Sequence, residues 1–429
     1  MYMNFIEELK WRGLIQDITP TFEDEINEKM KVGYIGFDPT SDSLHIGSLV
    51  QLIILKHFQN YGHKPIVLIG GATGMIGDPS GKSKERNLLS QEIIDQNIKS
   101  LHVQFSKFLN FDDSDNSALI LNNFDWNNEL NIIEFFRDFG KALTVNYMMS
   151  KDSVKKRLGS DSSDGMSFTE FTYQLFQAYD FYYLNEKYDC SIQMGGSDQW
   201  GNITSGVELI RKKSGKKANA MTCPLITKVD GTKFGKTEEG NVWLDKNKTS
   251  PYKFYQYWLN SSDEDSKKYI KIFTFETKEF IEDLIDQHVK APHERILQKF
   301  IASELTKMVH SEEDLQKVLN ASNILFSKSK DSSFSDIDEE TFTQVFEGVP
   351  NNSISNEEYN KCSSIEELLM FSPLFSSKSD VFRSLKENSV SINKEKIDSN
   401  KDLSSIELIH NKYLVIQRGK KNYSLLILT

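Results

Sequence analysis

Two apolar segments of the chain are joined by Phe37-Asp38-Pro39-Thr40-Ser41-Asp42-Ser43-Leu44-His45-Ile46-Gly47-Ser48. Residues 32–37 are typical of a buried strand, and from Leu49 onward apolar residues recur at helical spacing until Gly62. The spacing therefore predicts a strand, a turn and a helix that begins near His45. Unpaired backbone N–H groups at such a helix start attract phosphate, and Gly47 lets a ligand approach the backbone. A capped helix with a surface histidine accounts for the same residues equally well.

Further apolar runs continue this alternation of strand and helix. Residues 65–69 (Pro-Ile-Val-Leu-Ile) are apolar throughout, which is typical of a parallel strand covered on both faces. Further strands are expected at residues 118–121 and 191–194, each followed by a helical pattern. We therefore expect an α/β fold with a doubly wound, Rossmann-like parallel sheet, in which ligands bind at the carboxyl ends of the strands.

Strand signals stop after the first half of the chain. Residues 251–326 are helical in pattern, and a polar, Ser-rich stretch follows. After residue 356 we expect short helices near 365–370 and 380–386, a strand at 390–392, and a hairpin that pairs 413–417 with 423–428. The expected order is a Rossmann-like domain (1–240), an α-helical domain (241–326), a linker (327–355) and a small α+β domain (356–429).

The composition is that of an ordinary soluble protein, with 38% hydrophobic and 26% charged residues among 429. No run approaches the roughly 18 apolar residues that a membrane helix needs, and the first residues resemble neither a signal peptide nor a transit peptide. We expect a cytoplasmic protein without a membrane partner. The net charge is −11, whereas residues 378–429 carry +4. This basic excess indicates either RNA contact or an ordinary solvated surface.

Two familiar phosphate motifs are absent from the sequence. Gly81-Lys82-Ser83 resembles the end of a P-loop, but Ile76 stands where the first glycine is required. The nearby glycines also miss the spacing of a dinucleotide fold. What remains is a Gly-rich turn that leads to Asp78, Lys82 and Arg86. The two cations are four residues apart, so they are expected to hold pyrophosphate or to be ordinary surface charges.

A second polar group lies on a predicted helix. Ser167 and Glu170 fit a capping box, so a helix begins there. Tyr173, Gln177 and Asp180 then fall on one narrow stripe of that helix. A phenol, an amide and a carboxylate on one face suit a small zwitterionic ligand that bears a hydroxyl group. Solvent exposure is the alternative, and the surrounding aromatic residues favour the pocket.

Two more loops carry polar residues beside glycines. Residues 193–201 (Gln-Met-Gly-Gly-Ser-Asp-Gln-Trp-Gly) join a strand to a helix, and Asp198 there is able to accept hydrogen bonds from ribose hydroxyls. Lys233 and Lys236 lie in a glycine-containing loop that could bring cations onto charge that grows during a reaction. Each loop alone is also compatible with a turn that binds nothing.

Taken together, these motifs resemble the bacterial-type tyrosyl-tRNA synthetases, a family of class I aminoacyl-tRNA synthetases. Residues 37–48 are similar to the first signature of the family, which usually ends His-Ile-Gly-His. Residues 233–237 (Lys-Phe-Gly-Lys-Thr) are similar to the second, lysine-containing signature. Residues 167–180, 195–204 and 249–258 also resemble family sequence, so the resemblance runs nearly end to end.

The resemblance implies the reaction and the substrates. The enzyme would activate L-tyrosine with ATP, accompanied by Mg²⁺ and without a protein-ligated metal, and would transfer tyrosyl to the 3′-terminal adenosine of tRNA(Tyr). The helical domain and the C-terminal domain would bind tRNA. Family members are homodimers, and residues 132–149 correspond to their interface.

The resemblance also assigns site residues. Those expected to bind tyrosine are Tyr34 and Asp180 at its hydroxyl, Asp78, Tyr173 and Gln177 at its ammonium group, and Gln193. Those expected to bind ATP are Gly36, Asp38, Thr40, His45, Gly47, Ser48, Gly196, Asp198, Lys233 and Lys236. Those expected to act in catalysis are His45, Lys82, Arg86, Lys233 and Lys236.

Ser48 departs from the family pattern, because the family usually has a second histidine there. A hydroxyl is shorter than an imidazole, and adenylate formation should survive the change. One alternative is therefore a synthetase-like RNA-binding protein without catalysis. A generic nucleotide-dependent α/β enzyme is the other, and it is disfavoured by the failed P-loop and dinucleotide spacings.

Overall fold

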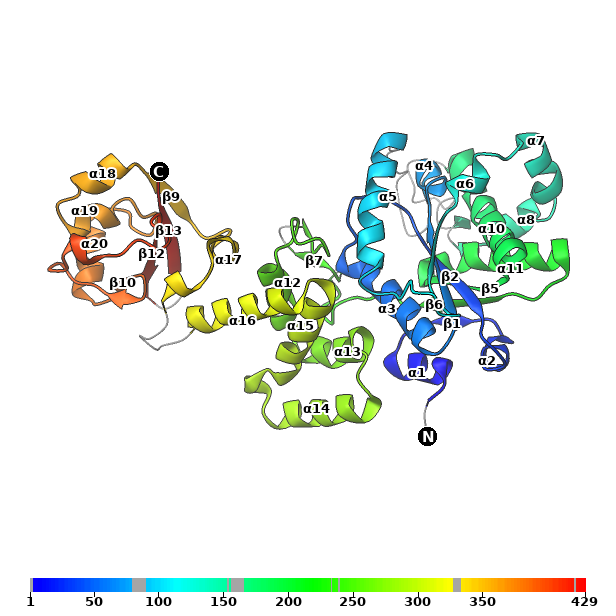
Figure 1. Ribbon diagram of the computed structural model, residues 1–429, viewed down its shortest axis with the longest axis horizontal. Coiled ribbons are helices and arrows are strands. Elements are labelled where there is room, and N and C mark those ends of the chain that lie inside the picture. The colour runs from blue at the N-terminus through cyan, green and yellow to red at the C-terminus, as the bar shows by residue number, and fades with distance from the viewer. Residues whose placement is uncertain are drawn as a thin grey trace. The chain divides into compact units, whose positions relative to one another are not determined.

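The computed structural model (Figure 1) describes residues 3–78, 90–152, 154–155, 166–232, 234–237, 240–326, 333–419 and 422–429. Contacts divide the chain into two compact units. The first contains Met1–Thr249 and Tyr257–Val309, and the second contains Ser250–Gln256 and His310–Thr429. Among the described residues, no helix has both the length and the apolar character needed to cross a membrane.

A six-stranded sheet forms the centre of the first unit, in the order β1-β6-β5-β2-β3-β4. Its strands are β1 (Asp17–Ile18), β2 (Val32–Phe37), β3 (Lys64–Ile69), β4 (Leu119–Asn122), β5 (Cys190–Gly196) and β6 (Asn219–Cys223). All neighbouring pairs are parallel except β1 with β6. The doubly wound parallel sheet is thus confirmed, with a short antiparallel edge strand that the sequence did not predict. The strand order reverses between β2 and β5, which is where such sheets bind ligands.

Helices cover both faces of this sheet (Figure 1). Helices α3 (Ile46–Asn60) and α5 (Gln91–Phe105) lie on one face, and α10 (Phe168–Tyr188) and α11 (Trp200–Ser214) lie on the other. Side chains of β2 alternate between these faces. The Tyr34 ring contacts Phe181 of α10, with centroids 5.4 Å apart, whereas the Phe37 ring contacts Phe105 of α5 at 5.1 Å. At Gly33, a Cβ would come within 2.9 Å of the Phe58 ring of α3.

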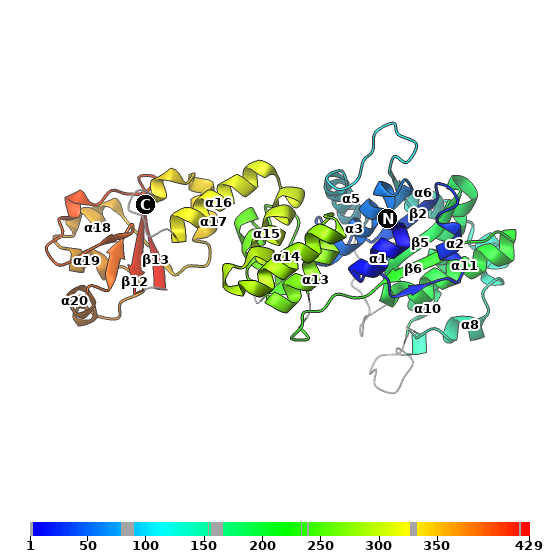
Figure 2. The same ribbon diagram turned by 90° about the horizontal axis from the view of Figure 1, so that it is seen from below.

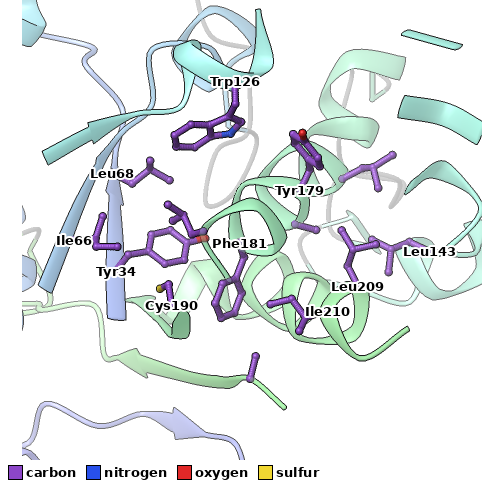
Figure 3. Close-up of a cluster of buried hydrophobic side chains, with 14 of the residues drawn as sticks. Tyr34, Ile66, Leu68, Trp126, Leu143, Tyr179, Phe181, Cys190, Leu209 and Ile210 are labelled. Carbon is purple, nitrogen blue, oxygen red and sulfur yellow. The ribbon is translucent and has the colours of Figure 1, made fainter. Parts of the chain in front are cut away.

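A buried apolar cluster lies between the sheet and α10 and α11 (Figure 3). Tyr34 and Ile66 come from neighbouring strands, and Phe181 and Ile210 come from α10 and α11. Trp126 adds the segment that follows β4. Tyr34 and Leu68 of this cluster also line a cavity, so the cluster forms part of the wall of a site as well as a core.

Arg12 joins the N-terminal helix α1 (Phe5–Arg12) to the helical part of the unit. Its buried guanidinium donates to Glu8 at 2.7 Å and to the backbone carbonyls of Lys271 and Thr274 at 2.6 and 2.7 Å. A buried charge requires such partners. The helices that follow are α13 (Asp263–Phe273), α14 (Lys278–Lys290) and α15 (Ile296–Val309), as the helical pattern predicted.

The remaining elements before residue 310 are short, apart from α12. They are α2 (Phe22–Glu25), α4 (Thr73–Ile76), α6 (Phe124–Asn127), α7 (Ile132–Phe135), η1 (Phe136–Gly140), α8 (Val145–Met149), η2 (Ser197–Gln199), β7 (Lys236–Thr237), β8 (Gly240–Asn241), α12 (Pro251–Leu259) and η3 (Pro292–Glu294).

The second unit contains a five-stranded sheet in the order β11-β10-β12-β13-β9. Its strands are β9 (Asn351–Ile354), β10 (Val390–Ile392), β11 (Glu395–Lys396), β12 (Tyr413–Arg418) and β13 (Asn422–Leu428). Its helices are α16 (Glu312–Phe326), η4 (Phe334–Asp336), α17 (Glu339–Val345), α18 (Asn356–Lys361), α19 (Ile365–Leu369), α20 (Lys378–Lys386) and η5 (Leu403–Ser405). The predicted hairpin is confirmed, with Tyr413 opposite Ile427 and Gln417 opposite Tyr423.

Much of the expected linker at 327–355 is folded. Helices α18 and α19 lie on one side of the sheet and α17 on the other (Figure 2). The Phe342 ring of α17 contacts Tyr413 of β12 at 5.1 Å, and β9 pairs in parallel with β13. The sequence did not predict strand β9, because β9 reads Asn-Asn-Ser-Ile. It lies at an edge of the sheet, where a strand with one buried apolar residue can still pair. Residues 327–332 lie outside the described residues, and the other domain boundaries stay predictions.

Protonation of His57 should weaken the fold in acid. Burial, reinforced by Arg12, lowers the pKa of His57 to about 3, whereas an unfolded histidine titrates near pH 6.5. The unfolded chain therefore takes up the proton first, so the stability contributed by a neutral His57 is complete above about pH 6.5 and is lost as the pH falls. Between pH 7.5 and pH 5, the contribution of His57 to the free energy of unfolding should fall by about 2 kcal/mol.

Urea unfolding at both pH values tests this for the wild type and His57→Gln. The variant should lose less stability between the two pH values than the wild type does. His293→Gln is the control, because the His293 side chain is exposed, and it should keep the wild-type loss. An equal loss in all three proteins would contradict the effect assigned to His57.

Candidate functional site

A cavity of about 340 Å³ opens at the carboxyl ends of β2 and β5. This is the edge of the sheet at which the strand order reverses. The structure brings together many of the predicted site residues there: Tyr34, Gly36, Asp38, Thr40, Ser48, Asp78, Tyr173, Gln177, Asp180, Gln193 and Asp198 all line the cavity. The stripe predicted on α10 therefore faces a pocket and not solvent.

The buried carboxylate of Asp180 forms one wall of the cavity. It is 2% exposed and accepts hydrogen bonds from Asn123 Nδ2 at 2.8 Å, Trp126 Nε1 at 2.7 Å and Asn127 Nδ2 at 2.8 Å. Burial raises the pKa of Asp180 to about 7, although the three donors oppose this shift. The site thus maintains a carboxylate in apolar surroundings by surrounding it with donors.

Tyr34 Oη lies in the same buried region. The Tyr34 side chain is 1% exposed, and its hydroxyl makes no hydrogen bond to any residue that the structure describes. Burial, and next the Asp180 charge, raise the pKa of this hydroxyl. A buried hydroxyl without a partner is destabilising. Its position in a cavity wall beside a carboxylate indicates that a hydroxyl group of a ligand supplies its hydrogen-bond partner.

A second set of polar groups surrounds Gln177 of α10. Gln199 Nε2 donates to Asp78 Oδ2 at 2.6 Å, and Asn202 Nδ2 donates to Gln177 Oε1 at 3.1 Å. Gln193 Oε1 is buried and has no hydrogen-bond partner among the described residues. These oxygen-rich groups suit a cationic ligand group.

Asp38 lies between the two polar regions. Its carboxylate accepts from Thr73 Oγ1 at 3.1 Å and from Tyr173 Oη at 3.5 Å. Asn123 Nδ2 in turn donates to Thr73 Oγ1 at 3.0 Å. A continuous series of polar contacts therefore connects Tyr173 to Asp180 around the cavity wall.

His45 is the N-cap of α3, as the sequence predicted. Its Nδ1 accepts the Gly47 backbone N–H at 3.0 Å, so the proton of a neutral ring lies on Nε2. A Cβ at Gly47 would come within 2.7 Å of the His45 ring, which explains the glycine. Ser48 follows in the first turn and lines the cavity, whereas His45, Gly47 and Gly196 do not line it.

The structure does not describe the side chains of the four other basic residues predicted at the site. Lys82, Arg86 and Lys233 lie outside the described residues, and only the backbone of Lys236 is described, in β7. Their roles stay predictions.

The sequence did not predict the residues that hydrogen-bond to other site residues and hold them in place. Asn123, Trp126 and Asn127 follow β4, and Thr73 follows β3, at the same edge of the sheet. A signal was available, since polar residues directly after a predicted parallel strand lie at the ligand-binding edge. Gln199 lies in the glycine-rich segment 193–201 and Asn202 follows it directly, but nothing in their spacing distinguished them.

Known proteins similar to this chain are consistent with the site. Residues 26–327 match the family described as "tRNA synthetases class I (W and Y)", and residues 341–426 match the "Tyrosine--tRNA ligase SYY-like C-terminal domain". The chain is 53% identical to a tyrosine–tRNA ligase of Flavobacterium psychrophilum over 99% of both chains. It is 54% identical to that of Bacteroides thetaiotaomicron, over 99% of this chain and 100% of the relative.

Solved structures agree. A C-terminally truncated mitochondrial tyrosyl-tRNA synthetase of Aspergillus nidulans matches with a TM-score of 0.69 and 30% identity, over 76% of this chain and 95% of that one. The fold is thus that of a class I aminoacyl-tRNA synthetase. Within that class, the chain belongs to the tyrosine–tRNA ligases, which are ATP-dependent ligases. These relatives do not favour the alternatives of a non-catalytic RNA-binding protein or a generic nucleotide enzyme.

Proposed function

We propose that the cavity binds L-tyrosine and ATP side by side and that the chain charges tRNA(Tyr) in two steps. The tyrosine carboxylate attacks the α-phosphate of ATP, which forms tyrosyl-adenylate and releases pyrophosphate. A ribose hydroxyl of the terminal adenosine of tRNA then attacks the activated carbonyl and displaces AMP. The observation that carries the proposal is the buried Tyr34 hydroxyl, without a described partner, beside the Asp180 carboxylate.

The phenolic hydroxyl of tyrosine would bind between Tyr34 and Asp180. It would donate to the Asp180 carboxylate and would supply the partner that Tyr34 Oη lacks among the described residues. Phenylalanine would leave both buried groups without that partner, and an unsatisfied buried polar group opposes binding. The apolar wall around Tyr34 would hold the ring. Selectivity would therefore come from one hydroxyl group.

The tyrosine ammonium group would bind at the opposite polar region. Asp78 supplies charge, and Tyr173, Gln177 and Gln193 supply oxygen acceptors around the same cavity. This arrangement holds the tyrosine carboxylate at a fixed position relative to ATP. Fixing the reacting atoms in this way provides a large part of catalysis when no protein nucleophile is used.

ATP would bind along the start of α3 and the end of β5. Its phosphates would meet Thr40, the Nε2–H of His45 and the backbone near Gly47, where the positive end of the helix dipole lies. Ser48 and Asp198 would meet the ribose, with Gly36, Asp38 and Gly196 close to the nucleotide. Lys82, Arg86, Lys233 and Lys236 would stabilise the charge that develops on the departing pyrophosphate.

Mg²⁺ would arrive with ATP as part of the substrate. Among the described residues, no group of three or more His, Cys, Asp or Glu side chains is arranged to hold a metal ion. The nucleotide would carry its own cation, and the chain's residues would position its phosphates.

The proposal includes a homodimer, tRNA binding by the C-terminal part and a cytoplasmic location. Support for the dimer comes from exposed apolar residues on α7 and α8, where Ile132 and Ile133 are 68% and 73% exposed and Val145 is 59% exposed. Such a patch favours a protein partner. Support for tRNA binding is the family match of residues 341–426 and the net charge of +4 on residues 378–429. The class of enzyme supports the location.

Tyrosine-dependent ATP–pyrophosphate exchange tests the first step. The wild-type chain should exchange only when tyrosine is present. Lys236→Ala should lower kcat by about 10²- to 10³-fold, because it removes a charge aimed at the transition state. Ser48→Ala should lower it by about tenfold or less, since a hydroxyl provides one neutral hydrogen bond. Absence of exchange by folded wild type would contradict the function, and equal losses would contradict the smaller role of Ser48.

Truncation separates the two steps. A chain that ends at residue 332 keeps the cavity residues but lacks α17 to α20 and the five-stranded sheet. It should retain tyrosine-dependent exchange and lose tRNA charging, because residues 378–429 with their net charge of +4 are removed. We choose residue 332 over residue 356 because α17 and β9 belong to the same core as the hairpin. Unimpaired charging by the truncated chain would refute the role of this region.

A further inference from the structure

Asn202 lies behind the predicted ammonium site without lining the cavity. It is in the first turn of α11 and is 5% exposed. Its side-chain amide approaches two glutamines from different elements, Gln177 of α10 and Gln199 of η2. It is therefore in a position to act on the ligand through these side chains.

The contacts define which end of each glutamine amide faces Asn202. Asn202 Nδ2 donates to Gln177 Oε1 at 3.1 Å and to Gln199 Oε1 at 3.3 Å. Gln199 Nε2 donates to Asp78 Oδ2 at 2.6 Å. An ionised carboxylate only accepts hydrogen bonds, so Asp78 requires the nitrogen end of Gln199. The oxygen end of Gln199 must then face a donor, and Asn202 supplies it.

The same donor group orients Gln177. If the Gln177 amide were turned over, its own NH₂ would face the NH₂ of Asn202, which is unfavourable. With Oε1 held towards Asn202, the second lone pair of that oxygen stays available as an acceptor. A turned amide would instead present donors to a cationic ligand. One asparagine thus maintains acceptor character at two neighbouring glutamines.

We propose that Asn202 is a positioning residue that makes the cavity selective for ligands with an ammonium group. The inference rests on the proposed function, since it concerns the amino end of the tyrosine site. Asn202 does this without contacting the ligand: its donors hold the orientation of Gln177 directly and that of Asp78 through Gln199. Without these donors, the Gln177 amide is free to turn and Gln199 loses the donor at its oxygen end, so the acceptors for the ammonium group are no longer held in place.

Three ligands separate the contribution of the ammonium group to binding from that of the carboxylate. L-Tyrosine has both charged groups, tyramine has the ammonium group without the carboxylate, and 3-(4-hydroxyphenyl)propanoate has the carboxylate without the ammonium group. Dissociation constants are measured by calorimetry with the full chain. The variants are Asn202→Leu, which is close in shape but has no donor, and Asn202→Ala. Asn185→Leu on α10 is the control, because Asn185 is buried but does not line the cavity or contact these glutamines.

Both Asn202 variants should weaken tyrosine and tyramine about tenfold or more, which is the effect of losing hydrogen bonds to a charged group. The propanoate should change less than about threefold, because its binding does not use these acceptors. The control should leave the ratio of the tyramine and propanoate constants unchanged. Equal weakening of all three ligands by the Asn202 variants would mean a purely structural role and would overturn the inference, as would no change. If the wild type does not prefer tyramine to the propanoate, the assignment of the ammonium site itself fails.

Discussion

The buried carboxylate of Asp180 is the constraint on which the rest of the site depends. A charge in an apolar core is unfavourable unless it is surrounded by donors. Asn123, Trp126 and Asn127 provide these donors from the segment after β4, so Asp180 ties α10 to the far edge of the sheet. The end of the cavity at Asp180 therefore has a fixed geometry before any ligand binds. Replacing one donor would disturb the fold and the site together.

Sheet topology brings the other end of the site to the same place. Strands β2 and β5 are neighbours, but the chain leaves them in opposite directions, so helices α3 and α11 begin on either side of one opening. The sequence left open whether His45 is a cap or a phosphate ligand. In the structure these are not alternatives, because capping uses Nδ1 and thereby assigns the proton to Nε2. The cap prepares the donor that the proposed ATP site requires.

Much of this architecture could be predicted from the sequence. Residues 65–69 of β3 are apolar throughout and predicted a parallel strand, and the apolar runs of β12 and β13 on either side of a short polar turn predicted a hairpin with the right pairing. The edge strands β1 and β9 were missed, because a strand of two residues or one with a single apolar residue gives no periodic signal. Asn202 was missed for another reason: a polar residue that orients other polar residues leaves no pattern along the chain, and only the folded geometry brings them together.

The most direct test of the account is the selectivity of Tyr34→Phe for tyrosine over phenylalanine in ATP–pyrophosphate exchange. This substitution removes a buried hydroxyl that has no described partner, so the free energy of unfolding should be unchanged or slightly higher. The ratio of kcat/KM for tyrosine to that for phenylalanine should fall about threefold to tenfold, which corresponds to one neutral hydrogen bond. An unchanged ratio would contradict the claim that this buried hydroxyl reads the hydroxyl of tyrosine.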